Sequence, residues 1–203
     1  KHLKAKKAKI KLTGNPVRKE IIAAEPENAY KFLNLDKNLI KIYQHAAENN
    51  EFQIVHLTGK KNYDQVIRSL KENDIDPDNR LIKVIAYLNE MEYALTAADL
   101  VISRAGATAL SEITLCGIPS ILIPLASAAE GHQLYNAKTL ENKGAAIIIR
   151  EEELAEQILL EKILTLFNDQ SKLEKMSKAA KSLANEDSLK KIITLIDNIV
   201  TKD

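Results

Sequence analysis

A turn of small residues beside a helix-like segment is the part of the sequence best suited to bind a charged ligand. Ser103-Arg104-Ala105-Gly106-Ala107 joins the apolar run 100–102 to residues with helical spacing. Small side chains let an anion approach the backbone, and the free N–H groups and dipole at a helix start favour negative charge. The pattern predicts a phosphate site at Gly106, although tight packing of a helix on a sheet would also require small residues.

A carboxylate follows this turn within reach of a sugar bound beside the phosphate. Glu112 is expected in the first turn of a helix that runs from about residue 108 to Cys116. A carboxylate that accepts hydrogen bonds from a ribose diol is the device that dinucleotide-binding folds use. A glutamate at this place would also stabilise any helix start by about 0.3–1 kcal/mol, so both interpretations stay open.

The elements around the turn follow the pattern of a parallel sheet covered by helices. The apolar runs 100–102 and 120–123 are expected to be strands buried on both faces. Gly117 and Pro119 end the helix between them. The inner face of that helix is expected to carry Ala109, Ile113 and Cys116. Ligands of such sheets bind at the carboxyl ends of the strands, which is where the turn lies.

Strand-like and helix-like segments alternate along the whole chain. Further strands are expected at 52–57, 81–86 and 145–149, and further helices at 27–35, 39–50, 62–72, 91–97 and 134–143. This order predicts the α/β class with a Rossmann-like, doubly wound parallel sheet and extra C-terminal helices. The last apolar stripe of the tail, formed by Leu189, Ile192, Ile196 and Ile199, is expected to pack on the core.

The composition limits the kinds of partner. With 203 residues, of which 45% are hydrophobic, the chain can form one large α/β domain. A formal net charge of +1, an aromatic content of 4% and the absence of tryptophan argue against a nucleic-acid partner. The single Cys116 is expected to be a small buried hydrophobe. With one cysteine no disulfide can form within the chain, which fits a reducing cytosol. No apolar run reaches the roughly 18 residues needed to span a bilayer.

Further candidate groups lie in expected loops. The lysine-rich residues 1–11 are interpreted as the solvated end of a linker, with a phosphate-seeking or membrane-surface patch as the alternative. Arg18 ends the turn 13–18, where a guanidinium can bind a phosphate or simply close a loop. Leu88 follows a strand, where its backbone could bond a flat heterocycle, and Gln133 stands at a helix entrance.

The motifs taken together resemble the MurG family, the bacterial N-acetylglucosaminyltransferases that make lipid II for peptidoglycan. The matching stretches are 13–18, 98–107, 111–113, 117–119, 133–137 and 144–146. The match covers nearly the whole chain as the C-terminal, donor-binding half of a GT-B glycosyltransferase. Residues 1–12 would then be the linker from a missing N-terminal domain, and residues 13–203 the UDP-sugar-binding domain.

The resemblance implies a role for each matching residue. Arg18 would contact the diphosphate of the donor, Leu88 would bond uracil through its backbone, and Gln133 would contact the donor sugar. Glu112 would bind the ribose hydroxyls. The implied UDP-N-acetylglucosamine site comprises Arg18, Leu88, Gly106, Ala107, Thr108, Ala109, Leu110, Ser111, Glu112 and Gln133. The family needs no metal and no cofactor.

The implied activity is an inverting transfer of N-acetylglucosamine from UDP-N-acetylglucosamine to lipid I, catalysed peripherally at the cytoplasmic face of the bacterial inner membrane. The catalytic base would belong to the missing domain, so this chain alone is expected to be inactive. Two alternatives stay open. One is a non-catalytic nucleotide-sugar-binding subunit of a split membrane glycosyltransferase. The other is a UDP-sugar epimerase, for which only Glu130 and His132 could serve as acid and base.

One departure from the family pattern concerns the centre of the sheet. The family has a strand and a Gly-Gly-Ser-type turn before the helix that starts near Leu39, whereas here Asn38 joins Leu39 directly. The sheet is expected to lose a strand, and the diphosphate a nest of N–H donors. Deletion of a central strand would cost more than the marginal stability of a domain, which favours omission of the segment from the sequence over its deletion.

Overall fold

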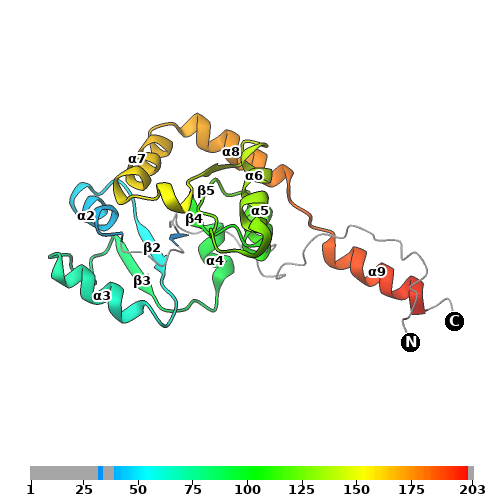
Figure 1. Ribbon diagram of the computed structural model, residues 1–203, viewed down its shortest axis with the longest axis horizontal. Helices are drawn as coiled ribbons and strands as arrows, with labels where there is room; N and C mark the ends of the chain where they lie inside the picture. Colours follow the sequence, from blue (N-terminus) through cyan, green and yellow to red (C-terminus); the bar gives the residue numbers. More distant parts are fainter. Residues whose placement is uncertain (1–31, 34–38, 201–203) are drawn as a thin grey trace.

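A six-stranded sheet forms the centre of the molecule (Figure 1). The computed structural model describes residues 32–33 and 39–200. The strands are β1 (Phe32–Leu33), β2 (Ile54–Leu57), β3 (Ile82–Ile85), β4 (Val101–Ser103), β5 (Ser120–Leu122) and β6 (Ala146–Ile148). All neighbouring pairs are parallel, in the order β3-β2-β1-β4-β5-β6. This is the strand order of dinucleotide-binding doubly wound sheets, so the predicted fold class is confirmed.

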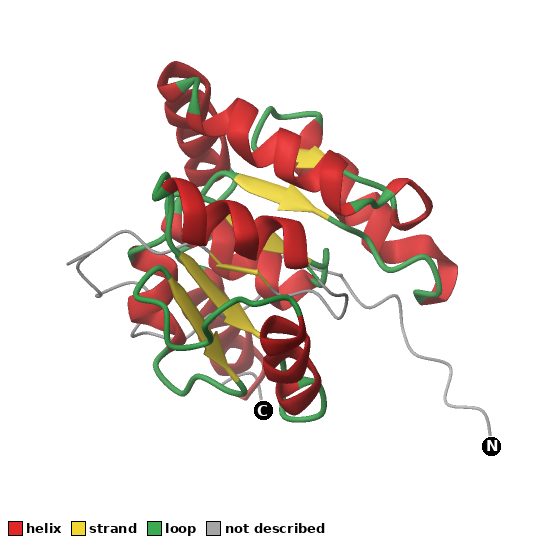
Figure 2. Ribbon diagram, turned by 90° about the vertical axis from the view of Figure 1, so that its left-hand side faces the viewer, coloured by secondary structure: helices red, strands yellow, loops and turns green. Residues whose placement is uncertain are grey.

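Helices cover both faces of the sheet, as Figure 2 shows. They are α2 (Ile40–Asn49), α3 (Tyr63–Glu72), α4 (Met91–Thr96), α5 (Ala107–Cys116), α6 (His132–Glu141), α7 (Glu156–Phe167), α8 (Gln170–Ser182) and α9 (Ser188–Val200). Two short 3-10 turns, η1 (Ala129–Gly131) and η2 (Glu151–Glu153), lie before α6 and α7. One apolar core joins the sheet to α2, α3 and α7, and a second joins it to α4, α5 and α6.

The centre of the sheet differs from the sequence prediction. The helix predicted over 27–35 is wrong at Phe32 and Leu33, which form the strand β1 between β2 and β4. The sheet therefore keeps a central strand. Parallel pairing with β2 on one side and β4 on the other overrides the local helical preference of these two residues. The linker assigned to 1–12, the turn 13–18 and Arg18 lie outside the described residues.

The central helix α5 ends as the sequence predicts. Gly117 has a φ of +68°, and the N–H of Ile118 donates to the carbonyl of Ile113 at 3.1 Å. The predicted inner stripe is partly wrong, because Ala109 and Cys116 are only half-buried. The buried residues of α5 are Leu110, Ile113, Thr114 and Leu115. The buried face is wider than one stripe because α5 packs on α8 as well as on the sheet. Lys181 Nζ in α8 donates to the carbonyl of Leu115 at 2.7 Å.

The prediction that the last helix packs on the core is wrong. Figure 1 shows α9 extending away from the rest of the domain. Its apolar residues are exposed by 42% at Leu189, 53% at Ile196 and 72% at Ile199. Helical periodicity identifies an apolar face but does not say what covers it.

A buried polar pair joins α2 to the sheet. The hydroxyl of Tyr43 hydrogen-bonds Nδ1 of His56, and both side chains are almost completely buried. Burial raises the pKa of Tyr43, so the hydroxyl stays protonated and serves as the donor. Tyr43→Phe removes this donor and is expected to lower the free energy of unfolding by about 1–3 kcal/mol in a urea titration.

The control for this prediction is Tyr93→Phe. The side chain of Tyr93 is 62% exposed. Removal of the Tyr93 hydroxyl is expected to change the free energy of unfolding by less than about 0.5 kcal/mol. Equal effects of the two substitutions would contradict a specific role for the buried pair.

Candidate functional site

The start of α5 is an open helix N-terminus at the carboxyl edge of the sheet. β4 ends at Ser103, and α5 begins at Ala107 with Gly106 as its N-cap. Ala107 and Thr108 are exposed, and no side chain of the described residues caps this helix. The first backbone N–H groups of a helix have no partner within it, so they remain available here to an anion.

Gly106 leaves space at this helix start. Its φ of −71° and ψ of 141° are extended values that any residue adopts, so the backbone does not require glycine. A Cβ built on Gly106 would meet no atom within 4 Å. The missing side chain thus opens the helix start to a ligand and serves neither the turn nor the packing.

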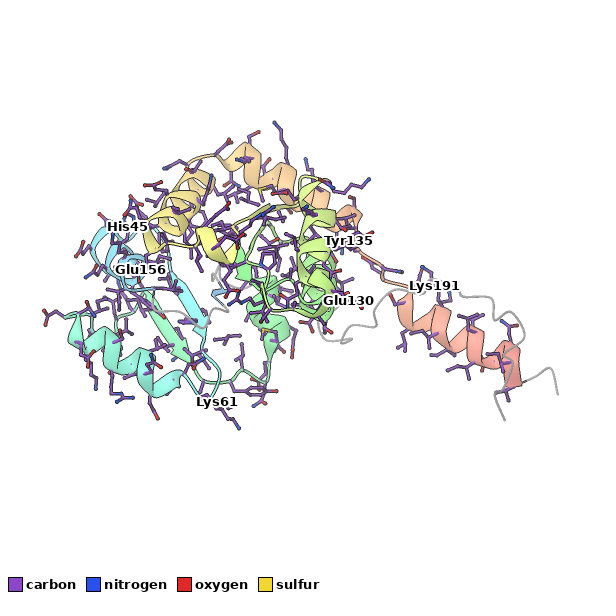
Figure 3. The ribbon with its side chains drawn as sticks, in the orientation of Figure 1. His45, Lys61, Glu130, Tyr135, Glu156 and Lys191 are labelled. Carbon is purple, nitrogen blue, oxygen red and sulfur yellow. The ribbon has the colours of Figure 1, made fainter. Side chains whose placement is uncertain are left out.

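The start of α2, at the same edge of the sheet, is capped by a carboxylate of the protein. The N–H of Ile40 at the start of α2 donates to Oε1 of Glu156 at 2.8 Å. Figure 3 shows Glu156 beside α2, on the first turn of α7. A carboxylate at a helix start takes the place that a phosphate would take. The N-terminus of α2 is therefore filled by the protein itself, whereas that of α5 is not.

Glu112 lies one turn further along α5 than predicted. It is the sixth residue of the helix, and the first turn carries no acid. The first-turn placement is wrong because α5 begins at Ala107, directly after the N-cap. The carboxylate lies one turn beyond the exposed Thr108 and is half-buried. The carboxylate therefore stands one turn away from the free N–H groups of the helix start, and its contact with a ribose stays a prediction.

Cys116 follows Glu112 by one turn and is a half-buried free thiol. Burial is the main cause that raises the pKa of its thiol to about 11, while Lys181 lowers it and Glu112 raises it. A thiol with this pKa is protonated at neutral pH, and only the thiolate attacks. The predicted role as a small apolar residue stays the better interpretation, although the side chain is half-buried rather than buried.

Gln133 stands at the second position of α6, at the same edge. Its Oε1 accepts from the N–H of Leu125 in the loop after β5, at 3.0 Å. Because that backbone donor needs an acceptor, the amide oxygen faces the loop, and the amide NH₂ takes no part in this bond. The predicted position of Gln133 at a helix entrance is confirmed, and its contact with a sugar stays a prediction.

Three polar side chains that the sequence did not assign connect the loops around the start of α5. Arg104 donates to Glu151 Oε1 at 2.9 Å, and Asn136 Nδ2 donates to the carbonyl of Ala105 at 3.2 Å. In the sequence, Arg104 stands out only as a member of the turn 103–107, and Asn136 only as a member of the matching stretch 133–137. Neither position indicates a contact with another element. Glu151 belongs to a run of three glutamates, which in sequence is typical of a solvated turn.

Leu88 is at the expected edge but contacts a different hollow. It follows β3 and, with Ile85 and Ala94, lines a depression over the β2–β3 side of the sheet. The start of α5 lies on the other side of β1, after β4. The structure thus brings together residues 106–112 and Gln133 along the β4–β6 half of the edge, and places Leu88 on the other half.

Glu130 and His132, the pair required by an epimerase, are not arranged as an acid and a base. His132 Nδ1 lies 2.7 Å from the carbonyl oxygen of Ala129 within its own turn. Both side chains are exposed, and Figure 3 shows Glu130 at the loop before α6. The geometry gives the epimerase reaction no support.

The described residues also limit other kinds of site. Within 32–33 and 39–200, no group of three or more His, Cys, Asp or Glu side chains could hold a metal ion. In the same part of the chain, no helix has the length and apolar character needed to cross a bilayer.

Comparison with known proteins identifies the family. Residues 30–193 match the model of the glycosyltransferase family 28 C-terminal domain. A UDP-N-acetylglucosamine--N-acetylmuramyl-(pentapeptide) pyrophosphoryl-undecaprenol N-acetylglucosamine transferase from Halothermothrix orenii is 38% identical over 97% of this chain and 59% of its own length. The enzyme of the same name from Caldanaerobacter subterraneus is 38% identical over 96% of this chain and 58% of its own length.

Solved structures agree with this assignment. Acinetobacter baumannii MurG superposes with a TM-score of 0.67 and 26% identity, covering 91% of this chain and 55% of that one. The glycosyltransferase VinC, solved with dTDP, has a TM-score of 0.60 and 14% identity over 90% of this chain and 45% of that one, which is a likeness of fold alone.

The chain spans less than two thirds of the length of these curated relatives. The alignment with the Halothermothrix orenii enzyme extends over 218 positions, more than the chain has residues, so that relative carries residues with no counterpart here. The strand order, the open start of α5 and the family match lead to one conclusion: this chain belongs to glycosyltransferase family 28, as its C-terminal domain with the GT-B fold.

Proposed function

We propose that this chain is the donor-binding part of an inverting glycosyltransferase of peptidoglycan synthesis. The enzyme transfers N-acetylglucosamine from UDP-N-acetylglucosamine to lipid I, the undecaprenyl-pyrophosphoryl muramoyl-pentapeptide, and forms lipid II. Relatives at 38% identity carry this activity in their names. The observation that carries the proposal is the uncapped start of α5 beneath Gly106, which offers N–H donors and open space at the edge where such folds bind ligands.

The proposed arrangement assigns a role to each group at the edge. The diphosphate lies on the N–H groups of Ala107 and Thr108, and the ribose hydroxyls donate to Glu112 one turn further on. The hydroxyl of the muramoyl sugar attacks the anomeric carbon, and UDP leaves with the bonding electrons. The dipole of α5, its free N–H groups and the guanidinium of Arg18 stabilise the charge that develops on the departing diphosphate.

The base that takes the proton from the attacking hydroxyl belongs, in this proposal, to the part of the enzyme outside this chain. The purified 203-residue chain is therefore expected to bind the donor without forming lipid II. The whole enzyme acts at the cytoplasmic face of the membrane, where its lipid-linked acceptor is held, and needs no nucleic acid. A non-catalytic nucleotide-sugar-binding subunit of a split enzyme is the alternative, and turnover after addition of the N-terminal part would distinguish the two.

The experiment that tests donor binding is calorimetric titration of the chain with UDP, UDP-N-acetylglucosamine and UDP-glucose. Glu112→Gln removes the charged acceptor and is expected to weaken UDP binding by about 1–3 kcal/mol, the value of a hydrogen bond to a charged group. UDP binding by the parent chain supports the proposed site, whereas failure of all three nucleotides to bind would overturn it.

The control for this titration is Glu174→Gln. Glu174 is an exposed residue of α8 that lines a different hollow, together with Gly117 and Pro119 at the opposite edge of the sheet. Its substitution is expected to leave UDP binding unchanged. If Glu112→Gln and the parent chain bind UDP equally well, the assignment of Glu112 to the ribose is wrong.

A further inference from the structure

An ion pair lies between the turn before α5 and the segment after β6. Arg104 NH2 contacts Glu151 Oε1 at 2.9 Å, with side-chain exposures of 18% and 22%. The other terminal nitrogen of Arg104 donates to the carbonyl of Ile123, directly after β5, at 3.3 Å. An ion pair that is largely withdrawn from solvent is screened less than a surface pair and holds a more defined geometry.

The carboxylate of Glu151 makes a second connection through its other oxygen. Oε2 accepts from the N–H of Ala126, in the loop after β5, at 3.0 Å. Together with the bond from Leu125 to Gln133, this holds two neighbouring residues of the loop, and the bond from Arg104 to Ile123 holds the residue just before it. The loop 124–131 contains exposed residues and a non-glycine residue at positive φ, Glu130 at 52°. The bonds to Glu151 and Gln133 therefore add to the two backbone bonds that the loop makes within itself, from Ala128 to Leu125 and from Gly131 to Ala128.

The fixed loop stands next to the helix start that would hold the diphosphate. It connects β5 to α6, and β5 is the neighbour of β4, from which the turn to α5 departs. Leu88 follows β3, which lies across β2 and β1 from β4. A diphosphate at Gly106 with its nucleoside toward Leu88 directs the group on the second phosphate toward the β5–α6 loop and Gln133.

We propose that Glu151 is a positioning residue for the sugar end of the donor site. It touches neither the diphosphate nor the sugar. It holds Arg104 and Ala126 so that the β5–α6 loop and Gln133 present one preformed surface to the sugar. A loop fixed before binding loses less conformational freedom when the ligand arrives, so affinity for the sugar depends on this support. The inference rests on the proposed function, because it requires a UDP-sugar at the start of α5.

The test compares UDP-N-acetylglucosamine with UDP, which lacks the sugar and ends in a free phosphate. Glu151→Ala is expected to lower the affinity for UDP-N-acetylglucosamine at least about fivefold, while the affinity for UDP changes less than about twofold, because only the sugar contacts the loop. Glu151→Gln keeps an acceptor for Ala126 but removes the charge opposite Arg104, and is expected to give a smaller change in the same ratio. Hydrogen exchange at the Ala126 amide is expected to accelerate in Glu151→Ala.

The matched control is Glu152→Ala. Glu152 is the next residue of η2 and faces Arg150 in an exposed pair at 3.7 Å, with side-chain exposures of 64% and 50%. Its substitution is expected to leave both affinities and the exchange of Ala126 unchanged. Calorimetry on folded variants then separates the outcomes. If Glu151→Ala loses affinity equally for both ligands, or for neither, the role of Glu151 is wrong and the proposed function still stands. Failure of the parent chain to bind UDP overturns the proposed function itself.

Discussion

Gly106→Val is expected to abolish measurable UDP binding while the domain stays folded. The extended φ and ψ of Gly106 suit a β-branched residue, and a Cβ at this position meets no protein atom within 4 Å. The new side chain would occupy the space through which a phosphate reaches the N–H groups of Ala107 and Thr108. Loss of two hydrogen bonds to a charged group, each worth about 1.5–3 kcal/mol, corresponds to an affinity at least about a hundredfold lower.

Calorimetry and thermal unfolding of the same variant test this prediction together. The midpoint of unfolding is expected to change little, because the substitution neither strains the backbone nor displaces a neighbour. If Gly106→Val binds UDP like the parent chain, the diphosphate does not lie at the start of α5. If the variant unfolds at a much lower temperature, Gly106 serves the packing rather than the ligand.

Gly117→Val is expected to cause a large loss of stability, in contrast to Gly106→Val, which is expected to leave the midpoint of unfolding almost unchanged. Gly117 has a φ of +68°, where a β-branched residue is strongly disfavoured. A Cβ there would lie 3.2 Å from Cβ of Lys181 and 3.5 Å from the carbonyl oxygen of Ser177, both in α8. The backbone strain and the displacement of α8 together are expected to cost about 3 kcal/mol or more and to lower the unfolding midpoint by about 6–12 °C.

Gly144→Val separates the two causes. Gly144 also has a positive φ, +75°, but a Cβ on it would meet nothing within 4 Å. Its substitution is expected to cost only the backbone term, about 1–2 kcal/mol. The difference between the two variants in differential scanning calorimetry gives the cost of the contact with α8. Equal destabilisation would mean that α8 moves aside freely.

The parts of the fold that the sequence predicted are those set by local patterns. The apolar runs at β2 to β6, the glycine that ends α5 and the helix entrance at Gln133 each follow from neighbouring residues. The position of Gly106 at the carboxyl edge followed from the order of strand, turn and helix. The site could be located in this way because it is made largely of backbone, whose geometry the alternation of elements already determines.

The parts that the sequence did not predict depend on contacts between elements that are distant in the chain. Phe32 and Leu33 form a strand because two other strands offer them partners on both sides. Glu151 and Glu156 are alike in sequence, as glutamates of a charged stretch. One holds Arg104 and the other the start of α2. No periodicity in the sequence distinguishes Glu151 and Glu156 from the exposed Glu152. Their partners belong to elements that are distant in the chain.

The central place of β1 has a mechanical consequence for the whole domain. β1 pairs in parallel with β2 on one side and with β4 on the other, so Leu88, which follows β3, and Gly106, which follows β4, belong to opposite halves of the sheet. A nucleotide that contacts both residues would bridge the two halves. Its binding is therefore expected to slow their separation during unfolding.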